Sequence, residues 1–541
     1  MAGIQIGGIV SGFDTTSMVE QLMKAERTRV DTVVNKRKIA EYTQDAYNEV
    51  NKMYSDFILE MRDLFDVDRF ISNSGATRPG AMNNLSWLNK ATSSHESILT
   101  AKPTSGAAVG KHEITVHQLA DSAKFASSNN VKLDGSKPIS EQLGVNNFEI
   151  TITTAKGTTT IKDTDGTMTF DQLVKEMNQI EGLNASYDAS IGRFFLQTSE
   201  TGADQFVQID GPHADQLLGE LHLNMTSGTK YAGQNAIIDY NGAAGIEFSS
   251  NEFRLQGLDI QLKGVNPGQK VNVTVEMDTD EVLNRMETFV SKYNELVEKI
   301  GDKLVEKVYH KDYAPLTDEQ KKEMTEKEIE LWESKTKSGL VRNDSTITSI
   351  QNALRDALLQ PVKLADGTTI SLSEFGISGK GYFEGGNKGQ LTIDKDKFRE
   401  AMQTKGDSFG KLMFSTPTDS SLNVLDKGLS SSQLSQKRSE SGIFNRISDI
   451  MINGMQQIIQ KSGTGNNESR LREVSSNILL DFVKGGSKSV YGNLIKDYND
   501  RITALNAKLT KIESRYWSQF SAMEKAISNM QSNSSALYNL F

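Results

Sequence analysis

Few side chains of this chain are arranged for chemistry. Its 541 residues include six His and no Cys, which excludes disulfides, thiolate nucleophiles and thiolate metal sites. None of the histidines has the spacing that brings two imidazoles to one metal ion. His112 and His117 lie five residues apart in a strand-like run, so we expect their side chains to point to opposite faces. We therefore expect no metal site.

Two further motifs could hold a ligand, and both fit a plain turn or loop better. Asp163-Thr-Asp-Gly166 is similar to the start of a calcium loop, but it lacks the later carboxylates and its Gly comes too early. The Gly-rich run from Gly379 to Gly386 does not have the dinucleotide-binding spacing. The chain also has no Gly-x-Ser-x-Gly elbow and no Walker loop. We expect a protein that is not an enzyme and that binds no cofactor.

The strongest periodic signals lie near the two ends of the chain, and they predict long helices that pack against another helix. The N-terminal seam is spaced 3-4-3-4-3 and consists of Tyr47, Val50, Tyr54, Phe57, Met61 and Leu64. Before it, Ser17 and Glu20 fit a capping box, followed by an apolar stripe of Met18, Val19, Leu22 and Met23. The C-terminal seam keeps the same period over Ile495, Tyr498, Ile502, Leu505, Leu509, Ile512 and Tyr516, and Met523, Ala526 and Met530 continue its phase. A bundle within one chain and a coiled coil between chains both fit this pattern.

The middle of the chain has a different period. Residues 95–275 contain short alternating runs bounded by Gly and Asn, which indicate antiparallel strands, with one helix expected over 169–180. Helical periodicity returns from Asp280. The high charge of residues 316–337 predicts a solvated helix or a linker. The Ser-rich composition of residues 415–442 predicts a loop. The expected fold is a multidomain α+β protein: both termini build a helical, coiled-coil base, and nested antiparallel β-rich head domains are inserted between them.

Composition narrows the function classes. A net charge of −10 argues against a general nucleic-acid binder. We find neither a stretch of about 20 apolar residues nor a secretory signal, so we expect no membrane insertion. Two hypotheses remain: a structural or assembly protein whose helical ends pack with other subunits, or an extracellular binding protein or hydrolase that displays β-domains on a stalk. The strict heptads favour the first.

Several motifs, in order along the chain, resemble one known family. Residues 9–26, Ile-Val-Ser-Gly-Phe-Asp-Thr-Thr-Ser-Met-Val-Glu-Gln-Leu-Met-Lys-Ala-Glu, are similar to the N-terminal signature of the bacterial flagellar filament cap proteins, also called hook-associated protein 2 (FliD). The later matches are Ala232–Ala236, Tyr240–Gly242, Leu258–Lys263, Val271–Val275, Phe289–Val297, Ser338–Ser345, Leu372–Ile377, Gly389–Asp394 and Gln519–Glu524. The chain departs from the family pattern at Phe13, where Leu is usual. The charged stretch 307–337 looks like an extension, and residues 125–230 match the variable outer head only loosely.

The resemblance implies an assembly function. Members of this family cap the distal tip of the flagellar filament as a ring, usually of five or six subunits, and flagellin is inserted beneath the ring. The implied partners are other copies of the chain, flagellin, the hook–filament junction protein and a cytoplasmic export chaperone, with host mucus or glycans as an additional surface by analogy. The implied location is extracellular, at the flagellum tip, after export by the flagellar type III apparatus. The alternative is an adhesin or other surface-binding protein with β-domains on a helical stalk.

The resemblance and the periodicity together predict five parts and a set of interaction residues. The parts are a leg segment at 1–42, a helix-rich leg domain at 43–76 plus 278–440, an inner β head domain at 77–126 plus 231–277, an outer β-rich head domain at 127–230, and a helical leg segment at 441–541. The residues expected to contact other subunits or the filament are Met18, Leu22, Met23, Ile502, Leu505, Leu509, Ile512, Tyr516, Met523 and Met530.

Overall fold

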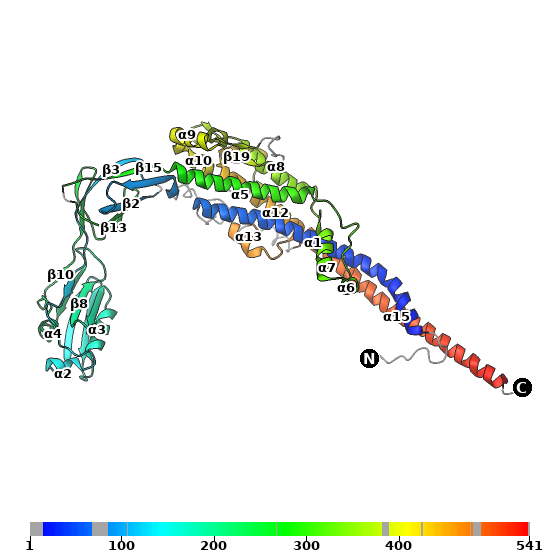
Figure 1. Ribbon diagram of the computed structural model, residues 1–541, viewed down its shortest axis with the longest axis horizontal. Helices are drawn as coiled ribbons and strands as arrows, with labels where there is room; N and C mark the ends of the chain where they lie inside the picture. The colour runs from blue at the N-terminus through cyan, green and yellow to red at the C-terminus, as the bar shows by residue number, and fades with distance from the viewer. Residues whose placement is uncertain are drawn as a thin grey trace. The chain divides into compact units, whose positions relative to one another are not determined.

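The computed structural model describes residues 14–67, 85–104, 106–266, 268–380, 389–422, 426–475, 478–479 and 488–538. The chain divides into two compact units, one formed by residues 83–281 and the other by the residues before and after this range (Figure 1). Residues 9–13 of the N-terminal signature, Phe13 among them, and residues 381–386 of the Gly-rich run lie outside the described residues. The two units are taken in turn.

The helical unit is built from long helices of both chain ends and a set of shorter ones between them. The long helices are α1 (Thr15–Phe65), α5 (Thr279–Val305), α12 (Ile443–Ser462) and α15 (Val490–Tyr538). The shorter helices are α6 (Asp318–Lys322), α7 (Glu326–Lys337), α8 (Ser345–Leu359), α9 (Lys395–Lys405), α10 (Phe409–Phe414), α11 (Ser431–Glu440) and α13 (Glu468–Val474). Two small hairpins pair β16 (Val362–Lys363) with β17 (Thr369–Ile370) and β18 (Ile377–Gly379) with β19 (Leu391–Ile393).

Aromatic side chains form the core where α1 meets the other helices. The ring of Phe65 lies 5.3 Å from that of Phe414 and 5.9 Å from that of Phe289. All of the predicted N-terminal seam is buried except Leu64, which is half-buried while the neighbouring Phe65 is fully buried. An α-helix has 3.6 residues per turn and drifts by about 20° per heptad against a strict 3.5 repeat, so the contact moves on by one residue at the end of the seam.

The β-rich unit contains two separate hydrophobic cores. One core lies under a five-stranded sheet of order β1-β15-β3-β11-β12 and a three-stranded sheet of order β13-β14-β2. Their strands are β1 (Asn89–Ser93), β2 (Leu99–Pro103), β3 (Gly110–Gln118), β11 (Ala236–Tyr240), β12 (Ala243–Phe248), β13 (Glu252–Leu255), β14 (Leu258–Leu262) and β15 (Val271–Met277). Every strand pairing is antiparallel, as the alternating runs predict.

The second core joins two more antiparallel sheets with short helices. One sheet has the order β10-β9-β5-β6 and the other β4-β8-β7. Their elements are β4 (Lys124–Ala126), α2 (Ile139–Leu143), β5 (Phe148–Thr154), β6 (Gly157–Asp163), α3 (Phe170–Gln179), β7 (Leu183–Asp188), β8 (Arg193–Thr198), β9 (Phe206–Asp210), α4 (Ala214–Glu220) and β10 (Tyr231–Ala232). A capping box of Thr169 and Gln172 begins α3, which confirms the predicted helix. Asp163 and Asp165 both accept the backbone N–H of Thr167, so the calcium-like motif is a turn.

The loop expected over 415–442 is wrong for its second half, which contains α11. Ser430 and Gln433 form a capping box at its N-terminus, and this signal is hidden in the Ser-rich composition. The charged stretch forms two helices, α6 and α7, each begun by a capping box. The five-part division of the chain remains a prediction; α1 is one continuous helix across the boundary expected at residues 42 and 43.

Candidate functional site

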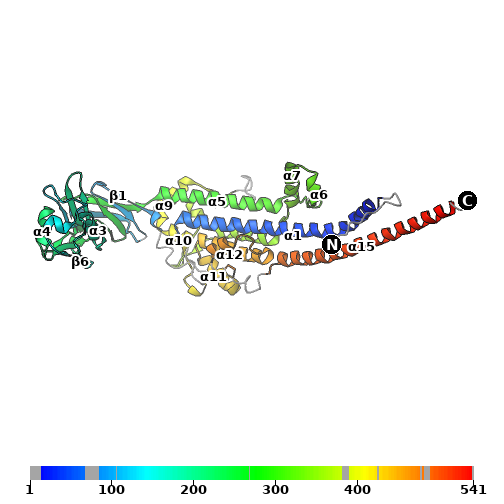
Figure 2. The same ribbon diagram turned by 90° about the horizontal axis from the view of Figure 1, so that it is seen from below.

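The helices of the two chain ends, α1 and α15, lie side by side and run antiparallel (Figures 1 and 2). The guanidinium of Arg37 donates a hydrogen bond to Oδ1 of Asn499 at 3.1 Å. The rings of Tyr47 and Tyr491 are 5.8 Å apart, so residue numbers rise on one helix as they fall on the other. With a rise of 1.5 Å per residue, the 49 residues of α15 span about 73 Å.

Six of the predicted interaction residues lie along this pair with their side chains partly or fully covered. Met23 is buried, as are Val19, Val30 and Val33 of α1, which follow the spacing of a seam. The α15 members are half-buried, and they are Ile502, Leu505, Leu509, Ile512 and Tyr516. A two-helix contact covers only the facing side of a seam, so each α15 side chain retains exposed apolar surface.

The other four predicted residues are exposed: Met18 by 41%, Leu22 by 40%, Met523 by 38% and Met530 by 71%. Met18 and Leu22 each precede a buried residue by one position, which turns them about 100° away from the covered face. Counting along both helices from the Arg37–Asn499 contact, Thr15 lies opposite about residue 521 of α15. Met523 and Met530 therefore lie beyond the first residue of α1.

A half-buried carboxylate, Asp344, connects the Tyr47 end of this helix pair to the rest of the helical unit. Asp344 accepts hydrogen bonds from the Tyr47 hydroxyl at 2.7 Å and from Nζ of Lys461 at 2.9 Å. It also caps the N-terminus of α8 by accepting the backbone N–H of Ile347 at 2.9 Å. We call Tyr47, Asp344 and Lys461 the Asp344 network.

Electrostatics hold Asp344 in its ionised form. Burial acts to raise the pKa of Asp344, but the hydrogen bonds from Tyr47, Ile347 and Lys461 and the charge of Lys461 lower it below its usual value. Burial and the same hydrogen bond raise the pKa of the Tyr47 hydroxyl. Sequence reasoning missed this network, because its members come from three distant helices; only the helix-capping role of Asp344 has a local signal.

The charged helices α6 and α7 pack against α1 beside the terminal pair. Nζ of Lys38 donates to the carbonyl of Leu316 at 2.8 Å, and Nζ of Lys337 lies 4.9 Å from the ring centre of Tyr42. Lys321 and Glu333 pair at 2.6 Å and join α6 to α7. This stretch is therefore docked on α1 rather than being a free linker.

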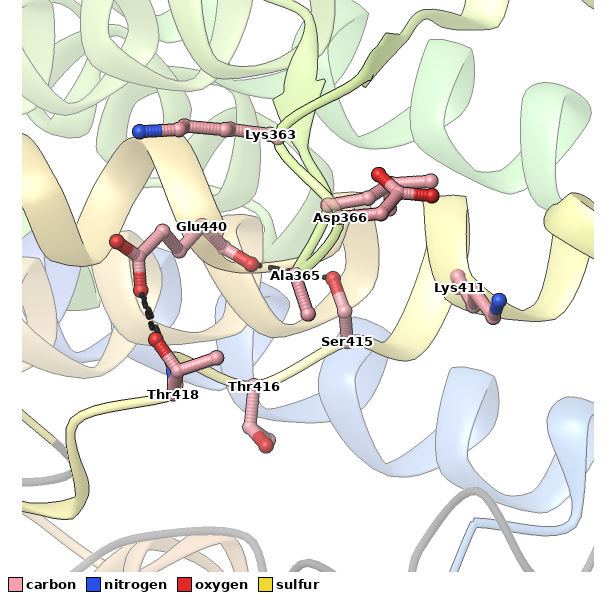
Figure 3. A pocket seen from close by; sticks show the side chains of 10 residues that line it. Lys363, Ala365, Asp366, Lys411, Ser415, Thr416, Thr418 and Glu440 are labelled. Carbon is pink, nitrogen blue, oxygen red and sulfur yellow. Dashed lines mark hydrogen bonds between the residues drawn. The ribbon is translucent and has the colours of Figure 1, made fainter.

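A separate hollow of 620 Å³ lies between the β16–β17 turn and the segment after α10 (Figure 3). Its lining includes Lys363, Asp366 and Lys411, and Glu440 accepts a hydrogen bond from the Thr418 hydroxyl at 3.1 Å. The residues that line it contain no His, Tyr or Cys. Within the described ranges, no group of three or more His, Asp or Glu could hold a metal ion, and none of the helices there is long and apolar enough to span a bilayer.

Comparisons with known proteins agree on one family. Residues 11–123 match the family described as flagellar hook-associated protein 2 N-terminus, and residues 233–532 match its C-terminus. The flagellar hook-associated protein 2 of Halalkalibacterium halodurans is 28% identical and covers 99% of this chain and 100% of its own length. That of Thermotoga maritima is 27% identical over 44% of this chain and 38% of its own length.

A solved structure shares the fold. The crystal structure of the D1-D2-D3 domains of the flagellar cap protein FliD from Escherichia coli is 20% identical, with a TM-score of 0.50. The similarity covers 77% of this chain and 96% of that one. The expected α+β fold, with terminal helices and inserted antiparallel sheets, is confirmed.

Proposed function

The chain belongs to the flagellar hook-associated protein 2 family, and we propose that it caps the distal tip of a bacterial flagellar filament. There it promotes the insertion and polymerisation of exported flagellin and prevents its loss. The family match supports this proposal, because it extends over both terminal helices and over the strands β1–β3 and β11–β15 between them. The alternative of an adhesin has no support among the related proteins.

The terminal helix pair is the observation that carries the proposal. Its α15 seam residues are half-buried by α1 and retain apolar surface for a further helix. Leu22, Met523 and Met530 add exposed apolar side chains near the same end of the pair. We propose that these surfaces contact filament subunits, or the hook–filament junction protein before the filament grows.

Further parts of the proposal follow from the family. The chain acts as a ring of five or six copies at the flagellum tip. It reaches that position through the flagellar type III apparatus after release from a cytoplasmic export chaperone. The absence of Cys is compatible with passage as an unfolded chain.

The test places two carboxylates in the seam. In a strain that lacks the wild-type gene, the chain carrying Leu505→Asp and Leu509→Asp should leave flagellin as monomers in the medium and abolish swimming. Its matched control carries Thr503→Asp and Ala507→Asp, which have the same spacing on the exposed side of α15. The control should restore filaments, which electron microscopy would count. Normal filaments from the seam variant, or equal failure of the control, would contradict the proposal.

A further inference from the structure

One side of α15 carries a row of cations. Arg501, Lys508, Lys511 and Arg515 are spaced 7, 3 and 4 residues apart, which places them along one side of the helix. All four are exposed, and in the described part of the chain none forms an ion pair with a carboxylate. We call them the basic ridge. Glu513 is the one acidic residue between its ends, so the ridge is strongly cationic in a chain of net charge −10.

The complementary charge lies on α6, α7 and their connection. Five exposed carboxylates of α6, α7 and their connection have no ion-pair partner among the described residues, and they are Asp318, Glu319, Glu323, Glu326 and Glu330. We call them the acidic face. Lys322 and Lys327 lie among them, so the face keeps a net negative charge. Leu331, beside Glu330, is 64% exposed; an exposed apolar residue bordered by charges is typical of a contact surface.

The residues directly before the ridge and directly before the face lie at the same level of α1. Arg37 bonds to Asn499 of α15, and the next basic residue, Lys38, bonds to Leu316 directly before α6. Figure 2 shows α6 and α7 on one side of α1 and α15 on the other. Within one chain, α1 therefore separates the two charged surfaces.

Two copies standing side by side in the same orientation would bring the ridge of one against the face of the next. Such a contact uses different surfaces on the two copies, and its repetition produces a closed ring where the rotation closes. Complementary charge favours this arrangement and disfavours the mirror pairings of ridge with ridge or face with face.

We propose that the basic ridge of α15 docks against the acidic face of α6 and α7 of a second copy, as a repeated contact around the cap. This inference rests on the proposed function and specifies how neighbouring subunits meet. It also gives the charged stretch 307–337 a role, as the acceptor of the neighbouring α15.

Charge exchange tests the contact. The ridge variant carries Lys508→Glu and Arg515→Glu, the face variant carries Glu326→Lys and Glu330→Lys, and a third chain carries all four. The control carries Glu298→Lys and Glu400→Lys, two exposed carboxylates of the same unit that form no ion pair in its described residues. Mass photometry and sedimentation measure self-association of each full chain, and far-UV circular dichroism measures helix content.

Each double variant should associate at least about tenfold more weakly than the wild type, because like charges then meet. The four-substituted chain should recover association, since its exchanged charges are again opposite in every contact. An equimolar mixture of the two double variants should recover association in pairs and in rings where the two variants alternate, since only contacts between unlike variants join opposite charges. Raising the salt from about 50 mM to about 500 mM should weaken the wild-type contact. The control should behave as wild type.

Three results would overturn the inference. They are wild-type association of both double variants, a four-substituted chain as weak as the doubles, and a wild-type chain that remains monomeric at every concentration. If a double variant loses helix content, the neutral pair Lys508→Gln and Arg515→Gln replaces it and should also weaken association. A ridge variant that self-associates normally but fails to build filaments would assign the ridge to flagellin instead. Filaments are scored separately, so a chain that shows the charge exchange but caps nothing would contradict the proposed function alone.

Discussion

Replacing Asp344 by Ala should destabilise the helical unit by about 2.5 to 4 kcal/mol. The loss of the α8 N-cap contributes about 1 kcal/mol. The lost hydrogen bond from the Tyr47 hydroxyl to a charged acceptor contributes about 1.5 to 3 kcal/mol. The Asp344 side chain is 12% exposed, so water does not replace these partners, whereas Lys461 is 30% exposed and regains water when its partner is removed.

Asp394 provides the matched control. It caps α9 by accepting the backbone N–H groups of Asp396 and Lys397, both at 3.2 Å, and its side chain is 47% exposed. Asp394→Ala should therefore cost only the cap, about 1 kcal/mol. Urea unfolding followed by circular dichroism at 222 nm, with hydrogen exchange in α8 to assign the transition, measures the difference of about 2 kcal/mol between the variants. Equal losses would refute the reasoning that the Asp344 network stabilises the helical unit more than a helix cap does.

The same network predicts a pH dependence. The folded pKa of Asp344 lies below its unfolded value of about 3.9. The carboxylate therefore contributes stability that is fully present above that unfolded value and is lost as the pH falls through the lower, folded pKa. Asp344→Asn retains a cap without the charge, so its stability should fall less steeply than that of the wild type below about pH 4. Parallel pH profiles of the two chains would contradict this assignment.

Three further predictions concern the β-rich unit. Phe170→Ala should lower the free energy of unfolding by about 3 to 5 kcal/mol, because this ring is fully buried and its centre lies 5.1 Å from that of Tyr187. Thermal unfolding should show a lower melting temperature of the β-rich unit, and an unchanged one would contradict the prediction. Gly233→Ala should destabilise, since an added Cβ would lie 2.4 Å from the Asp121 carbonyl oxygen, whereas Gly219→Ala meets no atom within 4 Å and should stabilise α4 by about 0.5 to 1 kcal/mol; equal melting temperatures would count against this. Replacing residues 122–233 by Asn-Gly should leave a folded remainder, because Asp121 and Gln234 exchange backbone hydrogen bonds of 2.9 and 3.0 Å; aggregation of that chain would refute the outer head as an insertion.

The spacing of apolar residues was sufficient to predict a buried helix face where several other helices cover it. The seam from Tyr47 to Met61 is buried as expected, because several helices of the same unit cover that part of α1. The same spacing does not show where along α15 the contact with α1 ends. Met523 and Met530 keep the phase of the α15 seam, but they lie past the first residue of α1 and are exposed.

The Ser-rich composition led to the wrong prediction of a loop, because helix-capping residues determine the structure there. The Ser-rich stretch contains the residues that begin α11, since Ser430 and Gln433 satisfy each other's backbone N–H groups. Contacts between distant segments have no local signal at all. Asp344 lies 297 positions from Tyr47 and 117 from Lys461, and Lys38 lies 278 positions from Leu316. Only the folded chain brings these residues together.

The continuity of α1 explains why a polar network lies at the junction. The 51-residue helix α1 packs against other helices in two places, in the aromatic core around Phe65 and along the seam with α15. Apolar seams tolerate small rotations of a helix, because dispersion contacts are not directional. The hydrogen bonds of Asp344 are directional, and they hold Tyr47 of α1 and Lys461 of α12 against the N-terminus of α8. The rotation of α1 about its axis is thereby determined at Tyr47, and with it the sides on which α6, α7 and α15 lie. A regular arrangement of copies around a cap requires those sides to be the same in every subunit.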